Sequence, residues 1–323
     1  MLTRRFLLAA APLATFAPTV AARAAAGSFS AFIDGLWAEG RRAGISEAVL
    51  STALSGLSPN EKVLELDHRQ PEFTLTWAEY RASRLSDKRV QQGRALWRQH
   101  RPLLQQVQAA YAVDPGVVMG IWGLESNYGG YTGGFNVVEA LATLAWEGRR
   151  AGFFRAELLA ALRILEAGVV TFPRMLGSYA GAMGQPQFMP SSFFRYAVDF
   201  DGSGRRDIWT NTADVLASIA NYLRQSGWRG GEPWGEAVSA PPGLAGAAGR
   251  ENRRSVQEWS RLGVRRADGG ELIPRAGTGA LILPDGEGGE AFLVYANFSA
   301  IRRYNPSDFY ALTVGLLGDL VTA

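Results

Sequence analysis

Apolar residues recur close to helical spacing along much of this chain, and this periodicity constrains its fold more than any other feature. Within residues 86–113, the apolar side chains that follow one helix face include Val90, Leu96, Trp97 and Leu103. Residues 29–100 carry further stretches of this kind, and residues 114–228 hold helical segments divided by glycine-rich loops. Amphipathic helices need neighbours that cover their apolar faces, so the sequence predicts a mainly helical body.

The composition changes after Trp228. Residues 230–249 are rich in Gly, Pro and Ala, and residues 280–295 predict two strands joined by a turn that contains an Asp-Gly pair. The helical pattern returns near the C-terminus. We therefore expect a mainly α (α+β) fold in four parts. These are an N-terminal segment at 1–26, a helical domain at 27–228, a small strand-containing insertion at 229–297 and a C-terminal helix at 298–323.

Residues 1–26 have the composition of an export signal. Arg4 and Arg5 form a charged start, an Ala/Leu/Phe-rich stretch follows, and small residues at 22–26 offer a cleavage site. The apolar run is too short to span a bilayer comfortably. A buried N-terminal helix is the alternative, but we favour a cleaved signal and a periplasmic protein. The arginine pair resembles a twin-arginine signal, yet ordinary secretory signals also begin this way, so the export route is left open.

The charge balance argues against nucleic acid as a partner. Of 33 Lys and Arg residues, Arg4, Arg5 and Arg23 lie in the signal, which leaves 33 − 3 = 30 against 30 Asp and Glu. The sequence has no cysteine, so its hydrophobic core must hold it together without disulfides. It also lacks a cysteine that could carry lipid. We expect no stable membrane anchor and a monomer.

A lone carboxylate follows an apolar run at Glu125, in the sequence "GIWGLESNYGG". Asp114 and Pro115 predict the start of a helix, on which Glu125 shares a face with Val118, Ile121 and Trp122. Desolvation on an apolar face and the negative end of the helix dipole both raise the pKa of a carboxyl group. A raised pKa suits a general acid. The alternative is a buried structural glutamate paired with an arginine.

Glu125 has no obvious partner nearby, whereas most glycosidases use two carboxylates. Glu139, the next acid along the chain, falls on the expected outer face of another helix. This favours chemistry that needs a single carboxylate. It leaves a muramidase open, with a second carboxylate supplied from a distant part of the chain.

Five ordered blocks of the sequence resemble the lytic murein transglycosylase B family. They include "GIWGLESNYGG", "GSYAGAMGQPQFMPSSFFRYAVDFDGSGRRDIW" and "NFSAIRRYNPSDFYALTVGLLGDL", and they span about 29–320, more weakly between 229 and 290. The resemblance implies a lysozyme-like helical fold and cleavage of peptidoglycan glycan strands between N-acetylmuramic acid and N-acetylglucosamine. It also implies that Glu125 acts as both acid and base while the muramic acid 6-hydroxyl attacks C1 and forms a 1,6-anhydro ring.

The resemblance extends to substrate-binding positions. Ser178, Gln187, Tyr222 and Asn305 match family positions that line the sugar groove or face the catalytic glutamate. The adjacent residues Arg149 and Arg150 match a family pair suited to bind the acidic stem peptide. From the residues alone, Tyr222 could be core and the arginines a solvated helix face. This chain departs from some members at Gln185 and Pro186, where they have tyrosine and glycine.

The stretch "DFDGSGRRD" begins with the spacing of a calcium loop. Asp199, Asp201 and Ser203 occupy ligand positions, but Thr210 stands at the twelfth position in place of glutamate. In the family a later aspartate completes the site, and Asp214 matches it, with Arg205 supplying its backbone carbonyl. Asp214 has a competing role in a helix cap after Asn211. We expect no cofactor for the chemistry and a structural Ca²⁺, with sodium or an empty loop as alternatives.

The sequence thus predicts a lytic transglycosylase, and three other functions are weighed against it. A muramidase would need a second carboxylate that positions water. A non-catalytic peptidoglycan-binding scaffold would not need Glu125 at all. A calcium-regulated binding protein is disfavoured because only one imperfect loop is present.

Overall fold

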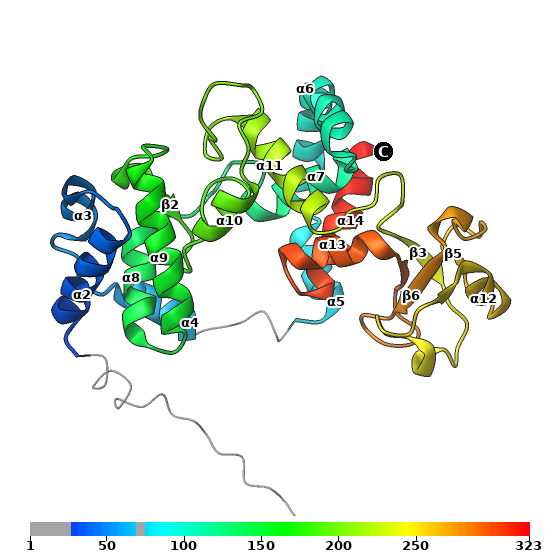
Figure 1. Cartoon of the computed structure of the whole chain (residues 1–323). Helices are drawn as coiled ribbons and strands as arrows, with labels where there is room; N and C mark the ends of the chain where they lie inside the picture. The colour runs from blue at the N-terminus through cyan, green and yellow to red at the C-terminus, as the bar shows by residue number, and fades with distance from the viewer. Residues whose placement is uncertain (1–26, 69–74) are drawn as a thin grey trace, which may run out of the picture.

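The protein is described from a computed structural model that covers residues 27–68 and 75–323. The predicted export signal at 1–26 lies outside these residues. The described chain is mainly helical with small sheets, as the sequence predicts. Figure 1 shows three groups of elements arranged side by side. Each group has its own hydrophobic cluster, and the cluster of the middle group also includes Ala280, Ile282, Phe292 and Val294 from the sheet. We call the three groups the α lobe, the central lobe and the β lobe.

The α lobe contains the N-terminal helices and a second helical stretch from the middle of the chain. Its hydrophobic cluster joins side chains of all of them around buried residues such as Leu36, Leu141 and Leu162. The elements are α2 (Phe29–Arg42), α3 (Glu47–Leu54), α4 (Glu61–His68), β1 (Phe135–Asn136), α8 (Val137–Glu147), α9 (Ala151–Glu166), η2 (Phe172–Arg174), β2 (Leu176–Gly177) and α10 (Pro190–Tyr196). The strands β1 and β2 pair antiparallel.

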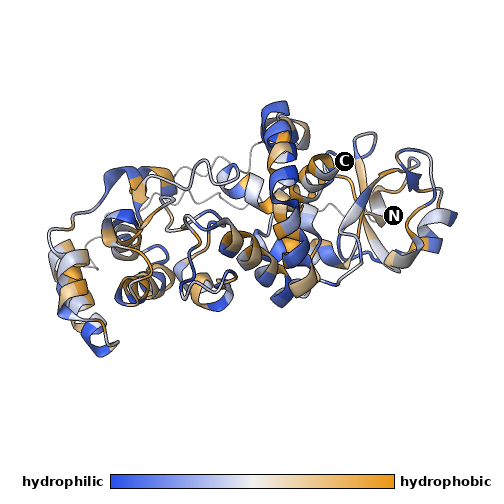
Figure 2. Ribbon diagram, turned by 90° about the horizontal axis from the view of Figure 1, so that it is seen from above, coloured by the Kyte–Doolittle hydropathy of each residue, from blue (hydrophilic) through white to orange (hydrophobic). Residues whose placement is uncertain are grey.

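The central lobe brings together helices that lie far apart in the sequence. They are α5 (Trp77–Arg84), α6 (Asp87–Tyr111), α7 (Pro115–Ser126), α11 (Thr212–Gln225), α13 (Ala296–Tyr304) and α14 (Asp308–Thr322). Figure 2 shows hydrophilic and hydrophobic residues on the same helices, as expected for helices that each cover a core with one face. The helix α7 is an exception, because its residues from Gly116 to Gly123 are all buried.

The β lobe is built on an antiparallel five-stranded sheet with strand order β4-β6-β7-β3-β5. The two strands predicted within 280–295 are β6 and β7, which pair antiparallel, so that prediction is confirmed. The elements are β3 (Gly235–Ser239), η3 (Ala245–Ala247), β4 (Arg254–Ser255), α12 (Val256–Arg261), β5 (Arg265–Arg266), η4 (Pro274–Ala276), β6 (Thr278–Ile282) and β7 (Ala291–Val294). The division of the chain at 228 and 297 stays a prediction.

Side-chain caps set the starts of the helices that carry the site. The Asp114 carboxylate accepts a hydrogen bond from the Gly116 amide at 2.7 Å, and Pro115 occupies the first turn, as the sequence predicts. Ser307 caps α14 in the same way, through a 3.3 Å bond from the Tyr310 amide. These caps fix which residues fall in the first turn of each helix.

The backbones of α7 and α14 approach closely because glycines replace side chains between them. A methyl group added at Gly120 would overlap the carbonyl oxygen of Val314, and one added at Gly318 would lie 2.5 Å from the carbonyl oxygen of Gly116. This close packing fixes the last turn of α7 relative to the first turn of α14.

The described residues form no helix that is both long and apolar enough to cross a membrane.

Candidate active site

Glu125 lies in the last turn of α7 and is half-buried. The residues that share its face, Val118, Ile121 and Trp122, are at most 2 % exposed, so the apolar surroundings inferred from the spacing are present. Since α7 is buried on nearly every side, that stripe is not its only apolar face. Glu125 is therefore a carboxylate at the open end of an otherwise enclosed helix.

The turn after Glu125 has an unusual backbone. Asn127 and Tyr128 have φ values of 49° and 57°, and Gly129 follows at 81°. The helix thus ends at Ser126 with Asn127 as its left-handed cap. Left-handed non-glycine residues are strained and cluster at functional sites. This left-handed turn begins only two residues after Glu125.

Tyr310, in the first turn of α14, contacts Glu125 directly. Its hydroxyl donates a hydrogen bond to Glu125 Oε1 at 2.5 Å. Burial is the main cause that raises the pKa of Tyr310 well above its usual range, and the negative charge of Glu125 is the second. The hydroxyl therefore keeps its proton and acts as the donor. Sequence reasoning missed this residue. The only available signal was its place in the block that also contains Asn305.

An aromatic cluster borders this pair of residues. The rings of Tyr222 and Tyr304 have their centroids 4.5 Å apart, and Tyr196 lies 4.2 Å from Tyr222. Burial is the main cause that raises the pKa of Tyr304 well above its usual range, and the negative charge of Glu125 adds to it. Burial raises the pKa of Tyr222 to about 12.

The hydroxyls of this cluster bind backbone carbonyls. Tyr304 donates to the Pro186 carbonyl at 2.6 Å, and Tyr222 donates to the Arg303 carbonyl at 2.6 Å. These bonds tie the loop that contains Pro186 and the helix α11 to the end of α13. Tyr222 thus packs as part of a core cluster, and its predicted contact with substrate stays a prediction.

Ser178 and Gln187 lie at the two ends of one loop that follows β2. The Ser178 hydroxyl accepts hydrogen bonds from the Ala180 and Ala182 amides at 3.3 and 3.1 Å. The Gln187 amide nitrogen donates to the Thr132 carbonyl at 2.9 Å, which binds the loop to the turn that follows Glu125. The same turn approaches β2 so closely that a methyl group at Gly133 would overlap the Gly177 carbonyl.

Asn305 leads directly into α14. Its side-chain oxygen accepts a hydrogen bond from the Ser307 amide at 3.1 Å, which stabilises the entry to the helix that carries Tyr310. The structure therefore brings Glu125, Tyr304 and Tyr310 together. It places the segment with Gln187 against the turn after Glu125, and Asn305 between Tyr304 and Tyr310 in the chain.

Arg149 and Arg150 lie elsewhere in the α lobe. Arg149 forms an ion pair with Asp67 and donates to the Asp67 carbonyl at 2.9 Å. The guanidinium of Arg150 lies 4.4 Å from the ring centroid of Phe153. Both follow the C-terminal end of α8, about 16 Å along that helix from β1. The structure does not bring them to Glu125, and their predicted role with the stem peptide stays a prediction.

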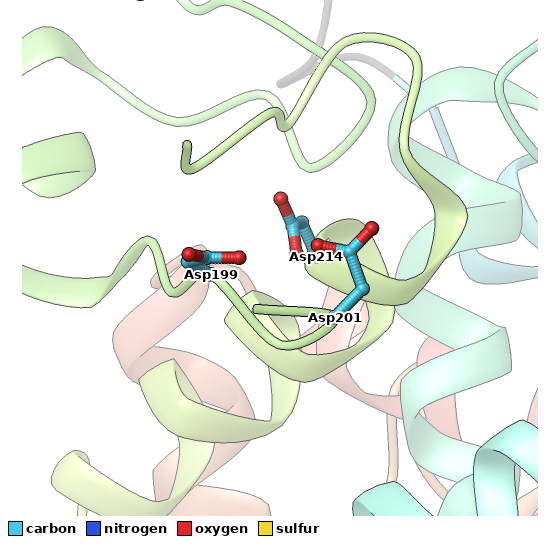
Figure 3. Close-up of side chains that lie close together, drawn as sticks. All are labelled: Asp199, Asp201 and Asp214. Atoms are coloured by element: carbon cyan, nitrogen blue, oxygen red, sulfur yellow. The ribbon is translucent and has the colours of Figure 1, made fainter. Parts of the chain in front are cut away.

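The carboxylates of Asp199, Asp201 and Asp214 converge beside the first turn of α11, as Figure 3 shows. One oxygen of each lies within 4.8 Å of those of the other two. Ser203 lies in the same loop, since its amide donates to Asp199 and Asp201 at 2.9 and 3.0 Å. Three carboxylates with nearby hydroxyl and carbonyl oxygens form the donor set that Ca²⁺ prefers, so the residues fit a calcium ion.

Asp214 also has a structural role. Its carboxylate accepts hydrogen bonds from the Phe200 amide at 2.7 Å and the Asp207 amide at 2.8 Å. The Asn211 side chain caps α11, and Asp214 closes the loop over that cap. The remaining predicted ligand, the Arg205 carbonyl, lies 3.4 Å from the Ser203 hydroxyl.

Glu139, the next acid after Glu125 along the chain, forms a hydrogen bond within the α lobe. Its carboxylate accepts a hydrogen bond from the Asn60 side chain at 3.1 Å. Glu139 therefore holds α8 to the segment before α4, a structural role consistent with its exclusion as a catalytic partner of Glu125.

Comparisons with known proteins agree on one family. Residues 28–319 match the family described as the transglycosylase SLT domain. The membrane-bound lytic murein transglycosylase B of Escherichia coli is 34% identical over 247 residues, which make up 76% of this chain and 67% of that protein.

Solved structures show the same relationship. The structure of SltB3 from Pseudomonas aeruginosa in complex with NAG-anhNAM-pentapeptide matches with a TM-score of 0.88 and 47% identity, over 92% of this chain and 80% of that one. The Escherichia coli lytic transglycosylase Slt35 in complex with calcium matches with a TM-score of 0.77 and 31% identity, over 91% and 92% of the two chains. The chain therefore belongs to the lytic murein transglycosylase B family, among proteins with a transglycosylase SLT domain.

Proposed function

We propose that this protein is a lytic transglycosylase that cleaves peptidoglycan between N-acetylmuramic acid and N-acetylglucosamine and leaves 1,6-anhydromuramic acid ends. The observation that carries the proposal is the single glutamate at the end of α7, held by Tyr310, in a chain that superposes on SltB3 bound to an anhydromuramyl peptide. Family membership supports the same reaction.

Glu125 can supply both proton transfers of this reaction. Its carboxyl proton goes to the glycosidic oxygen as the bond from that oxygen to C1 of the muramic acid breaks. The carboxylate then accepts the proton of the 6-hydroxyl while the 6-oxygen bonds to C1. This regenerates the acid and consumes no water, so no second carboxylate is required. The N-acetyl group of the substrate stabilises the charge that develops at C1.

Tyr310 tunes this carboxylate through its hydrogen bond. A donor to a carboxylate favours its charged form, so removal of the donor makes Glu125 hold its proton to higher pH. We expect Tyr310→Phe to shift the basic limb of the pH profile of kcat/KM upward, by roughly one to two pH units if the bond contributes the ~1.5–3 kcal/mol typical of a hydrogen bond to a charged group. Tyr111→Phe, at the end of α6, is the matched control and should leave the limb in place. An unmoved or lowered limb in Tyr310→Phe would contradict this role.

We propose that the sugar chain is bound by Ser178, Gln187, Tyr222 and Asn305. The stem peptide is proposed to contact Arg149 and Arg150. The first four lie in segments that meet the turn after Glu125, the end of α13 or the start of α14. The arginines lie at the far end of α8, so they can reach only a peptide that extends well away from the cleaved bond.

The loop at 199–214 is proposed to bind a structural Ca²⁺ through the carboxylates of Asp199, Asp201 and Asp214, the Ser203 hydroxyl and the Arg205 carbonyl. The convergence of the three carboxylates supports this assignment. The ion would take no part in the chemistry and would neutralise the clustered charge beside α11.

Calcium is expected to raise the midpoint of thermal unfolding of the wild-type protein. A ligand at about 100 times its Kd stabilises the folded state by about 2.7 kcal/mol. Asp201→Asn removes an exposed ligand, so its calcium-dependent shift should be much smaller. Asp268→Asn, at an exposed aspartate of the β lobe, is the matched control and should keep the full shift. Equal shifts in all three proteins would rule out binding at this loop.

We further propose that residues 1–26 direct export to the periplasm and are cleaved, and that the mature protein acts as a monomer. The composition of residues 1–26 supports export. Mass determination of the protein isolated from periplasm would show the cleavage.

A further inference from the structure

Gln185 uses both ends of its side-chain amide inside the protein. It is 8 % exposed, its Oε1 accepts a hydrogen bond from Trp122 Nε1 at 2.7 Å, and its Nε2 donates to the Trp209 carbonyl at 2.8 Å. Its backbone amide also donates to the Ile208 carbonyl at 2.9 Å. A buried amide with donor and acceptor both satisfied holds its neighbours in one arrangement.

These neighbours include the catalytic helix on both sides of Glu125. Trp122 lies one turn before Glu125 on the same face of α7. Gly129, in the left-handed turn after Glu125, lies against the amide, because a methyl group there would be 2.5 Å from Gln185 Oε1. Gln185 therefore contacts the segment before Glu125 and the turn after it.

The Trp209 carbonyl, which accepts the other hydrogen bond of the Gln185 side chain, lies in the segment at 207–209, just before α11. The Trp209 amide donates to the Asp207 carboxylate at 2.8 Å, and the Asp207 amide donates to the Asp214 carboxylate at 2.8 Å. Asp214 is fully buried. The carbonyl that Gln185 binds is thus part of a bonded segment and not of a free loop.

We propose that Gln185 is a positioning residue that fixes the last turn of α7, and with it the Glu125 carboxylate, against the segment at 207–209. Gln185 acts through its hydrogen bond with Trp122 and its contact with Gly129. The inference rests on the proposed transglycosylase function. Catalytic groups that move by about 1 Å can lose on the order of 100-fold in rate, so loss of the bridge should act on turnover.

The main test replaces Gln185 by methionine, which has a similar length, cannot donate to the Trp209 carbonyl and offers the Trp122 N–H only a weak sulfur acceptor. We expect kcat of Gln185→Met on purified peptidoglycan to fall roughly 10- to 100-fold, with KM within about twofold of wild type. Gln225→Met makes the same chemical change at an exposed glutamine of α11 and should keep kcat within about twofold. A folded Gln185→Met protein with wild-type kcat would overturn the proposal.

A second variant separates positioning from a general loss of stability. In Gln185→Glu the neutral acid can donate to the Trp209 carbonyl and accept from Trp122, whereas the ionised form can only accept. The ratio of its kcat to that of wild type should therefore rise as the pH is lowered. A ratio that stays constant with pH would contradict the bridge, even if Gln185→Met fails to fold.

A spectroscopic readout tests the bond without any activity measurement. The indole N–H resonance of Trp122 in the ¹⁵N-labelled protein, assigned with Trp122→Phe, should move upfield in Gln185→Met because it loses its acceptor. The same resonance should not move in Gln225→Met. An unmoved Trp122 signal in Gln185→Met overturns the inference, whereas failure of wild type to release anhydromuropeptides would refute the proposed function instead.

Discussion

Glu125→Gln is expected to abolish turnover of peptidoglycan while the protein stays folded and still binds glycan strands. Glutamine has the same shape and can accept the hydrogen bond from Tyr310, but it can neither donate the proton to the glycosidic oxygen nor accept one from the 6-hydroxyl. Because one residue performs both transfers, the loss in kcat should be on the order of 10⁴-fold or more. Turnover assays, thermal unfolding and sedimentation with insoluble peptidoglycan measure the three properties.

Glu139→Gln provides the matched control for this experiment. It makes the same chemical change at a glutamate that only binds Asn60, so kcat should stay close to the wild-type value. A Glu125→Gln protein with more than a few per cent of wild-type turnover would remove Glu125 from the mechanism. A wild-type protein that sediments with peptidoglycan but releases nothing would favour the scaffold function.

Gly120→Ala is expected to destabilise the protein by about 3 kcal/mol or to prevent its folding. The added methyl group would overlap the backbone carbonyl of Val314, and a carbonyl cannot rotate away as a side chain can. Helices α7 and α14 must then separate, which also pulls Tyr310 away from Glu125. Denaturant unfolding gives the change in the free energy of unfolding.

Gly35→Ala is the control for that variant. Gly35 lies within α2, and a methyl group there meets nothing within 4 Å, so the change should stabilise the protein by about 0.5–1 kcal/mol through helix propensity. If Gly120→Ala were as stable as wild type, the close approach of α7 and α14 would not determine the geometry of the site.

Local signals in the sequence were sufficient for several elements of the fold. The Asp114-Pro115 pair predicts the start of α7, and the Asp-Gly turn predicts the hairpin of β6 and β7. Both depend on residues that are close together in the chain. The end of α7 has no such local signal, because the left-handed turn there begins at a non-glycine residue, Asn127.

The surroundings of Glu125 could not be predicted from spacing, because they come from distant segments. Tyr310 is 185 residues away in the chain, and Gln185 is 63 residues from Trp122. The position of Tyr310 follows from the glycine-mediated packing of α14 on α7, which no pattern in either helix specifies alone. Arg149 likewise has a partner from a distant segment, and its ion pair with Asp67 holds it within the α lobe and not at Glu125.

Mass spectrometry of the muropeptides released from purified peptidoglycan tests the central claim most directly. A lytic transglycosylase releases products lighter by one water than the corresponding reducing-end muropeptides, so we expect these products from wild type and none from Glu125→Gln. Reducing-end products would contradict the claim. They would show that water attacks C1 and that a second carboxylate takes part in the reaction.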